Sequence, residues 1–89
     1  MRILILEDDD LLGPMLVRAL RRRGHQVVLV TNITALTLTL QTMVDEMPDI
    51  ILCATRWGWV GINPKEPVSH RYYHKGIDDL TVLFEIVES

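Results

Sequence analysis

The sequence has little of several residue classes, and each shortage excludes a class of protein. It contains one cysteine, Cys53, so no internal disulfide can form. Positive charge is also scarce, because nine Lys and Arg stand against twelve Asp and Glu. The formal charge of −3 gives no global attraction for a phosphate backbone. We therefore expect neither a disulfide-stabilised fold nor a nucleic-acid-binding protein.

Long apolar runs are missing as well. The first run, residues 3–6, stops at Glu7 and is too short for a signal peptide. Residues 24–44 carry no Asp, Glu, Lys or Arg, but the five threonines among them argue against a membrane span. This stretch fits a buried strand followed by an amphipathic helix. We expect a cytoplasmic protein with no membrane partner.

The chain has 89 residues, of which 48% are hydrophobic and 24% charged. This composition is typical of a folded globule and unlike that of a disordered chain. The length leaves no room for two domains. Residues 1–89 are therefore expected to form a single domain.

Short apolar runs alternate with segments of helical periodicity. The runs end abruptly at polar residues, which is typical of strands buried on both faces. The predicted strands are residues 2–6, 27–30, 50–54 and 68–74, and the predicted helices are residues 10 or 14 to 23, 33–47 and 78–88, with a loop at 55–67. This βαβ alternation predicts an α/β fold with a parallel sheet and right-handed crossovers.

Capping residues mark the expected helix ends. They are Asp9 and Asp10 for the first helix, Asn32 for the second and Asp78 for the third. The second helix is expected to run to Met47, because Pro48 cannot continue it comfortably. Its threonines have weak helix propensity, so packing must hold it in place.

Four segments carry a family resemblance. The opening Arg2-Ile-Leu-Ile-Leu-Glu7-Asp8-Asp9-Asp10 and the segments 16–27, 48–54 and 74–80 resemble receiver domains of bacterial two-component response regulators. The resemblance covers roughly residues 1–54 and 70–88. It implies a bacterial protein, or a phage protein derived from one, with a flavodoxin-like parallel sheet.

The resemblance also implies roles for individual residues. Glu7 and Asp8 match the acidic pair that holds magnesium in the family, and Lys75 matches the lysine that pairs with the phosphoryl group. Ala54 occupies the position of the aspartate that accepts this group, and a methyl group cannot be phosphorylated. Gly76 stands where the family usually has proline. The phosphorylation site is therefore interpreted as vestigial.

Two interpretations of the acidic cluster remain open. In one, the carboxylates are inherited and Lys75 is their internal counter-ion, with Asp8 as its partner. In the other, Glu7 and Asp8 still bind magnesium weakly, because carboxylate oxygens suit a hard cation. No other cofactor is expected.

The interval between Ala54 and Lys75 is too short for a complete receiver. The family places two helices and two strands there, which needs about 48 residues at average element and loop lengths. Only residues 55–74 are available. We therefore expect a compact, receiver-like parallel sheet shortened in its middle, with the third and fourth βα units reduced.

These departures predict a stand-alone pseudo-receiver that is not an enzyme and acts by protein binding. Trp57 and Trp59 either cover a sheet face or form an interaction surface, since aromatic residues are enriched at interfaces. The deletion is expected to leave residues 50–54 exposed as an apolar patch. A homodimer or a complex with another signalling or regulatory protein would cover that patch.

The alternative is a small magnesium-dependent phosphatase. The order Asp8-Asp9-Asp10 after a first strand is similar to haloacid-dehalogenase-type phosphatases, with Asp8 as nucleophile and Asp10 as acid. The family's glycine and threonine after this motif are missing, and Leu11 and Leu12 take their place.

Other candidate residues have simpler interpretations. His70 and His74 lack a further metal ligand at suitable spacing, and the arginines at 21–23 complement the dipole of a helix in its last turn. Cys53 fits a small buried hydrophobic residue rather than a nucleophile.

Overall fold

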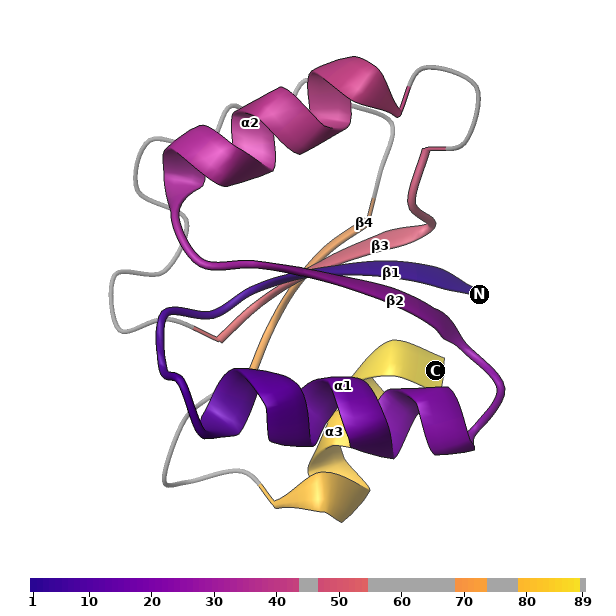
Figure 1. Cartoon of the computed structure of the whole chain (residues 1–89). Helices are drawn as coiled ribbons and strands as arrows, with labels where there is room; N and C mark the ends of the chain where they lie inside the picture. Colours follow the sequence, from indigo (N-terminus) through magenta and orange to yellow (C-terminus); the bar gives the residue numbers. More distant parts are fainter. Residues whose placement is uncertain (44–46, 55–68, 74–78, 89) are drawn as a thin grey trace.

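Strands and helices alternate along the chain (Figure 1), in a computed structural model that describes residues 1–43, 47–54, 69–73 and 79–88. The elements are β1 (Arg2–Leu6), α1 (Leu12–Arg22), β2 (Gln26–Val30), α2 (Ile33–Thr42), β3 (Ile50–Cys53), β4 (Ser69–Tyr72) and α3 (Leu80–Glu88). All seven predicted elements are present, and only their ends differ from the prediction.

The four strands form one parallel sheet in the order β2-β1-β3-β4. Ile5 of β1 lies opposite Leu29 of β2 on one side and Leu52 of β3 on the other. The predicted parallel sheet is confirmed. The β2-β1-β3 order is that of flavodoxin-like folds, in which the chain reverses direction along the sheet after the second strand.

Helices cover both faces of the sheet, as Figure 1 shows. The helix α2 lies on one face, and α1 and α3 lie on the other, as predicted. The core divides accordingly into two clusters because successive side chains of a strand point to opposite faces. One cluster joins the odd-numbered residues Ile3 and Ile5 to α1 and α3, and the other joins Leu4 and Leu6 to α2.

The uncharged stretch from residue 24 to 44 contains a strand and a helix, as expected. The Asn32 side chain accepts a hydrogen bond from the backbone N–H of Ala35 at 2.8 Å, which confirms the predicted cap of α2. The helix ends at Thr42 rather than at the predicted Met47. In this last turn, the Thr42 hydroxyl donates to the carbonyl of Thr39. Along the described ranges, no helix is both long and apolar enough to cross a membrane.

The start of α3 also differs from the prediction. The helix begins at Leu80, and Asp79 caps it, because its Oδ1 accepts a hydrogen bond from the N–H of Val82 at 3.0 Å. A carboxylate directly before the helix satisfies an amide of its first turn, and Leu80 then begins the apolar face. Asp78 itself lies outside the described residues.

The predicted exposure of β3 is wrong. Residues 50–54 are between 0% and 2% exposed. The strand lies between β1 and β4, so its backbone is paired on both edges. Ile51 and Cys53 pack in the cluster that contains Leu36 of α2, and Ile50 and Leu52 pack in the cluster of α1 and α3. β3 therefore offers no exposed apolar patch for a partner to cover.

Burial of Leu36 should account for much of the attachment of α2 to the sheet. Leu36 is 1% exposed, whereas Leu38 on the same helix is 57% exposed. We predict that Leu36→Ala lowers the free energy of unfolding in urea by about 2–5 kcal/mol. The matched control Leu38→Ala should change it by less than about 0.5 kcal/mol. Equal effects of the two substitutions would contradict this packing.

Candidate functional site

The carboxyl ends of three neighbouring strands align at one edge of the sheet. The N–H of Glu7 donates to Val30 O at 3.0 Å, that of Ala54 to Leu6 O at 3.0 Å, and that of Tyr73 to Cys53 O at 2.9 Å. These bonds extend the strand register by one residue, so that Glu7, Ala54 and Tyr73 lie side by side. This edge is where ligands bind in open α/β sheets.

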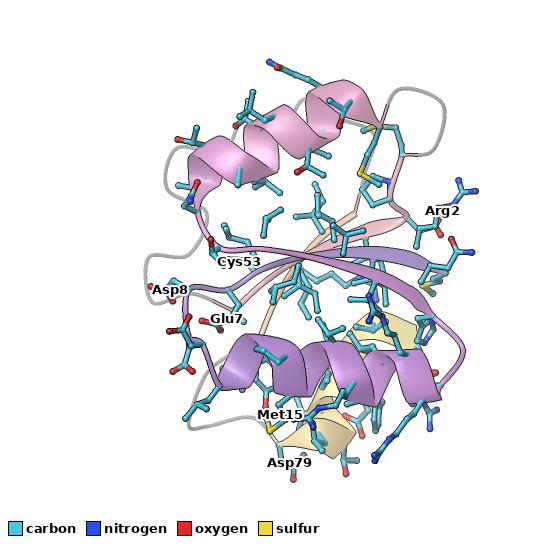
Figure 2. All side chains as sticks on the ribbon, in the orientation of Figure 1. Arg2, Glu7, Asp8, Met15, Cys53 and Asp79 are labelled. Carbon is cyan, nitrogen blue, oxygen red and sulfur yellow. The ribbon has the colours of Figure 1, made fainter. Side chains whose placement is uncertain are left out.

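Glu7 is a fully buried carboxylate at this edge, with an exposure of 0%. Its side chain lies on the face covered by α1 (Figure 2), and its Oε1 accepts a hydrogen bond from the N–H of Asp9 at 2.9 Å. Gly13 lies beside this carboxylate and makes room for Leu29, because a Cβ there would lie 3.0 Å from Leu29 Cδ2, closer than an ordinary contact, and 3.6 Å from Glu7 Cγ, an ordinary contact distance. Gly13 was not among the predicted site residues, although a glycine in the first turn of an apolar helix signals a close approach.

The three aspartates that follow Glu7 have different positions. Asp9 Oδ1 accepts hydrogen bonds from the N–H groups of Leu11 and Leu12, both at 2.8 Å, so its predicted capping role is confirmed. Among the described residues, no such bond is recorded for Asp10. Asp8 is exposed at the end of β1, as Figure 2 shows.

Ala54 is buried, with an exposure of 0%, and belongs to the core cluster on the same face as Glu7. Its methyl group offers no oxygen to a metal or to a phosphoryl group. Cys53 is buried on the opposite face, in the cluster with Leu36, as the sequence predicted. The structure therefore brings Glu7 next to Ala54, the residue for which the sequence resemblance predicts the vestigial acceptor position.

Several predicted site residues lie outside the described part of the chain. They are Lys75, Trp57, Trp59, His74 and the side chain of His70. Within the ranges that are described, no group of three or more His, Cys, Asp or Glu is placed to hold a metal ion.

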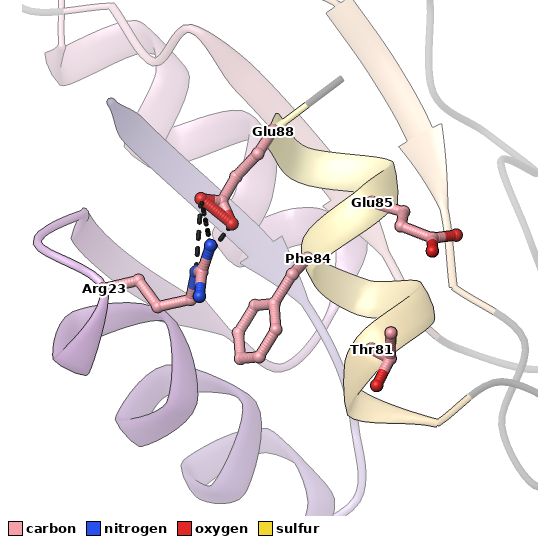
Figure 3. Close-up of a pocket in the computed structure, with 5 residues that line it drawn as sticks. All are labelled: Arg23, Thr81, Phe84, Glu85 and Glu88. Atoms are coloured by element: carbon pink, nitrogen blue, oxygen red, sulfur yellow. Dashed lines mark hydrogen bonds and ion pairs between the residues drawn. The ribbon is translucent and has the colours of Figure 1, made fainter.

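A second polar cluster lies between α1 and α3, around an open cavity of about 470 Å³ (Figure 3). Arg23 Nε lies 2.6 Å from Glu88 Oε1, and Arg23 Nη2 lies 3.1 Å from Glu88 Oε2. The guanidinium also stacks 4.5 Å from the centroid of the Phe84 ring. His25 Nε2 lies 3.6 Å from Glu88 Oε2. This cluster joins helix ends that are 65 residues apart in sequence, so periodicity could not reveal it.

The arginines at the end of α1 thus have specific contacts beyond the predicted dipole interaction. Arg21 Nη2 donates to the backbone carbonyl of Val27 in β2 at 3.1 Å, and Arg23 binds Glu88. The hydrogen bond from Arg23 is the main reason why the pKa of Glu88 is lowered from its ordinary 4.5.

No protein-family model matches the sequence, and neither a curated protein nor a solved structure matches it at a significant level. The fold established for this chain is thus a small α/β domain with a parallel sheet, and assignment to a family rests on the proposal below.

Magnesium should bind weakly or not at all at the acidic edge. Glu7 Oε1 is engaged by the Asp9 amide, and Ala54 supplies no ligand to the shell of about six oxygens that magnesium requires. We expect no saturable change in tryptophan fluorescence or in calorimetric heat at sub-millimolar magnesium. Tight, stoichiometric binding that Asp8→Ala abolishes and Asp10→Ala retains would contradict this.

The pair of Arg23 and Glu88 should make stability depend on pH. The folded-state pKa of Glu88 is depressed, so its stabilisation is present above pH 4.5 and is lost as the pH falls through the folded-state pKa. We predict that Glu88→Gln destabilises the protein at neutral pH and that the difference in unfolding free energy disappears in acid.

The control for this experiment is Glu85→Gln. Glu85 lines the same cavity, and no ion pair among the described residues involves it. The stability of this variant should follow that of the unsubstituted protein at every pH. A difference for Glu88→Gln that stays constant from pH 7 to acid would contradict the ion-pair interpretation.

Proposed function

We propose that the protein is a cytoplasmic pseudo-receiver, which binds another protein without being phosphorylated. The observation that carries this proposal is the methyl group of Ala54, buried at the end of β3 and next to Glu7 at the end of β1. In the receiver family, which the sequence resembles, an aspartate occupies this position. The surrounding sheet has the order expected for a receiver, but the group that would undergo the chemistry is absent.

The neighbouring side chains support a structural use of the inherited acidic residues. Asp9 is committed to the amides of Leu11 and Leu12, and Glu7 accepts from the Asp9 amide. These bonds fix the turn between β1 and α1. A domain that keeps this frame and lacks the acceptor can still present a surface to a partner, and such binding is the proposed activity.

The proposed partner is a protein of a signalling or regulatory system, or a second copy of this chain. Trp57 and Trp59 remain the proposed aromatic contacts, and both lie outside the described residues. The middle of the domain, residues 55–74, is proposed to be a shortened replacement for the family's third and fourth βα units.

Phosphorylation is the direct test. After incubation with acetyl phosphate and magnesium, we expect the intact mass of the protein to remain unchanged, because Ala54 offers no nucleophile. An authentic receiver domain treated in parallel should gain one phosphoryl group and thereby validate the conditions. Sedimentation at micromolar concentration, with Trp57→Ala and Trp59→Ala as probes, then tests association.

Other outcomes would contradict the proposal in different ways. A phosphoryl group that maps to Asp8, together with turnover of a coloured phosphoester, would favour the phosphatase alternative. A stable monomer that captures no protein from a bacterial lysate, with or without the tryptophan substitutions, would contradict protein binding.

A further inference from the structure

A groove of about 440 Å³ runs between α1 and the outer strand β2. Its apolar lining includes Pro14, Val17 and Leu29, and its charged lining consists of Arg18 and Arg21. In Figure 1, α1 lies alongside β2 at this border of the sheet. The groove is separate from the acidic edge and from the cavity around Arg23 and Glu88.

The strand β2 presents backbone hydrogen-bonding groups to this groove. Gln26 N–H donates to Met1 O and Val30 O accepts from Glu7 N–H, so the even-numbered residues of β2 face β1. Backbone groups alternate in direction along a strand, and those of Val27 and Leu29 therefore point outward. No strand in the described part of the chain pairs with this side.

One outward carbonyl is covered by a side chain. Arg21 Nη2 donates to Val27 O at 3.1 Å and so shields part of the edge. The outward N–H and C=O of Leu29 have no such cover among the residues described, and Val28 beside it is 44% exposed. An uncovered edge next to an apolar groove is a template for strand addition.

The charge at the groove determines which partner fits. Within α1, residues 12–22, there is no acidic residue, and no ion pair of the described residues involves Arg18 or Arg21. A second copy that paired through its own β2 would bring its arginines against these, and like charges across an interface are unfavourable. An acidic chain would meet complementary charge.

We propose that an extended, acidic segment of a partner protein adds to the sheet as a strand beside β2. The backbone of the segment bonds to Leu29 and Val27, and the segment's carboxylates face Arg18 and Arg21. Arg21 exchanges the Val27 carbonyl for a carboxylate when the strand binds. This inference rests on the proposed protein-binding function and specifies the surface and the chemistry of the partner.

The probe is a fluorescein-labelled peptide of alternating valine and glutamate, and its binding to the 89-residue chain is measured by fluorescence anisotropy. We expect saturable binding that Arg18→Glu weakens by about fivefold or more. Arg22→Glu is the matched control, because Arg22 is on the same helix and does not line the groove. It should weaken binding less than twofold. The Leu29 amide should gain protection from hydrogen exchange in the complex.

A second peptide separates strand addition from simple charge attraction. Its amides are N-methylated so that neither edge of the peptide can donate strand hydrogen bonds to β2, whichever register it takes. The charge is unchanged, and we expect this peptide to bind much more weakly. Equal binding of the methylated peptide, equal effects of Arg18→Glu and Arg22→Glu, or a preference for single-stranded RNA over the peptide would each overturn the inference. If a protein partner is found whose binding needs Trp57 and Trp59 but not Arg18, this inference fails while the proposed function stands.

Discussion

The whole arrangement depends on burying both faces of the two central strands. Residues 3–6 of β1 and 50–53 of β3 are all nearly inaccessible to solvent, so neither face of these strands tolerates exposure to water. A parallel sheet meets this requirement only when helices lie on both sides. The path of the chain follows from it, because each crossover must place its helix on one face or the other. The features outside the core lie at the borders of these layers. They are the acidic edge at the ends of the strands, the groove between α1 and β2, and the polar cluster of Arg23 and Glu88 at the ends of α1 and α3.

Local sequence signals predicted those parts of the fold that short stretches of chain determine. The continuous apolar run at residues 3–6 indicated a strand buried on both faces, and Asn32 marked the start of α2 through a bond to an amide three residues away. The end of α2 was less predictable. Thr42 bonds to the Thr39 carbonyl and the helix stops there, although the apolar pattern continues to Met47.

Contacts between distant segments were beyond such reasoning. The pairing of Arg23 with Glu88 depends on how α1 and α3 cross the same sheet face, and no spacing in the sequence encodes that crossing. The expected exposure of β3 failed for a related reason. The prediction of an exposed β3 rested on the number of helices that the chain lacks relative to a receiver. The burial of a strand depends instead on which strands and helices remain beside it, and β1, β4 and the three helices bury β3. At the candidate site, the acidic cluster was found from sequence, but the burial of Glu7 and the role of Gly13 required the structure.

The two ends of α1 are held by different chemistry, and this difference explains where a partner strand can act. At the amino end, the Asp9 carboxylate binds the amides of Leu11 and Leu12, which satisfies the positive end of the helix dipole. At the carboxyl end, Arg21 and Arg23 each bind a group outside the helix, on β2 and α3 respectively. The Arg23 contact is a stacked ion pair that joins α1 to α3, so we expect its loss to destabilise the domain. The Arg21 contact is one hydrogen bond from an exposed side chain to a carbonyl, and a partner backbone can replace it at little cost. Among the described residues, this edge of β2 therefore remains available for pairing, whereas the central strands β1 and β3 are paired on both edges and buried.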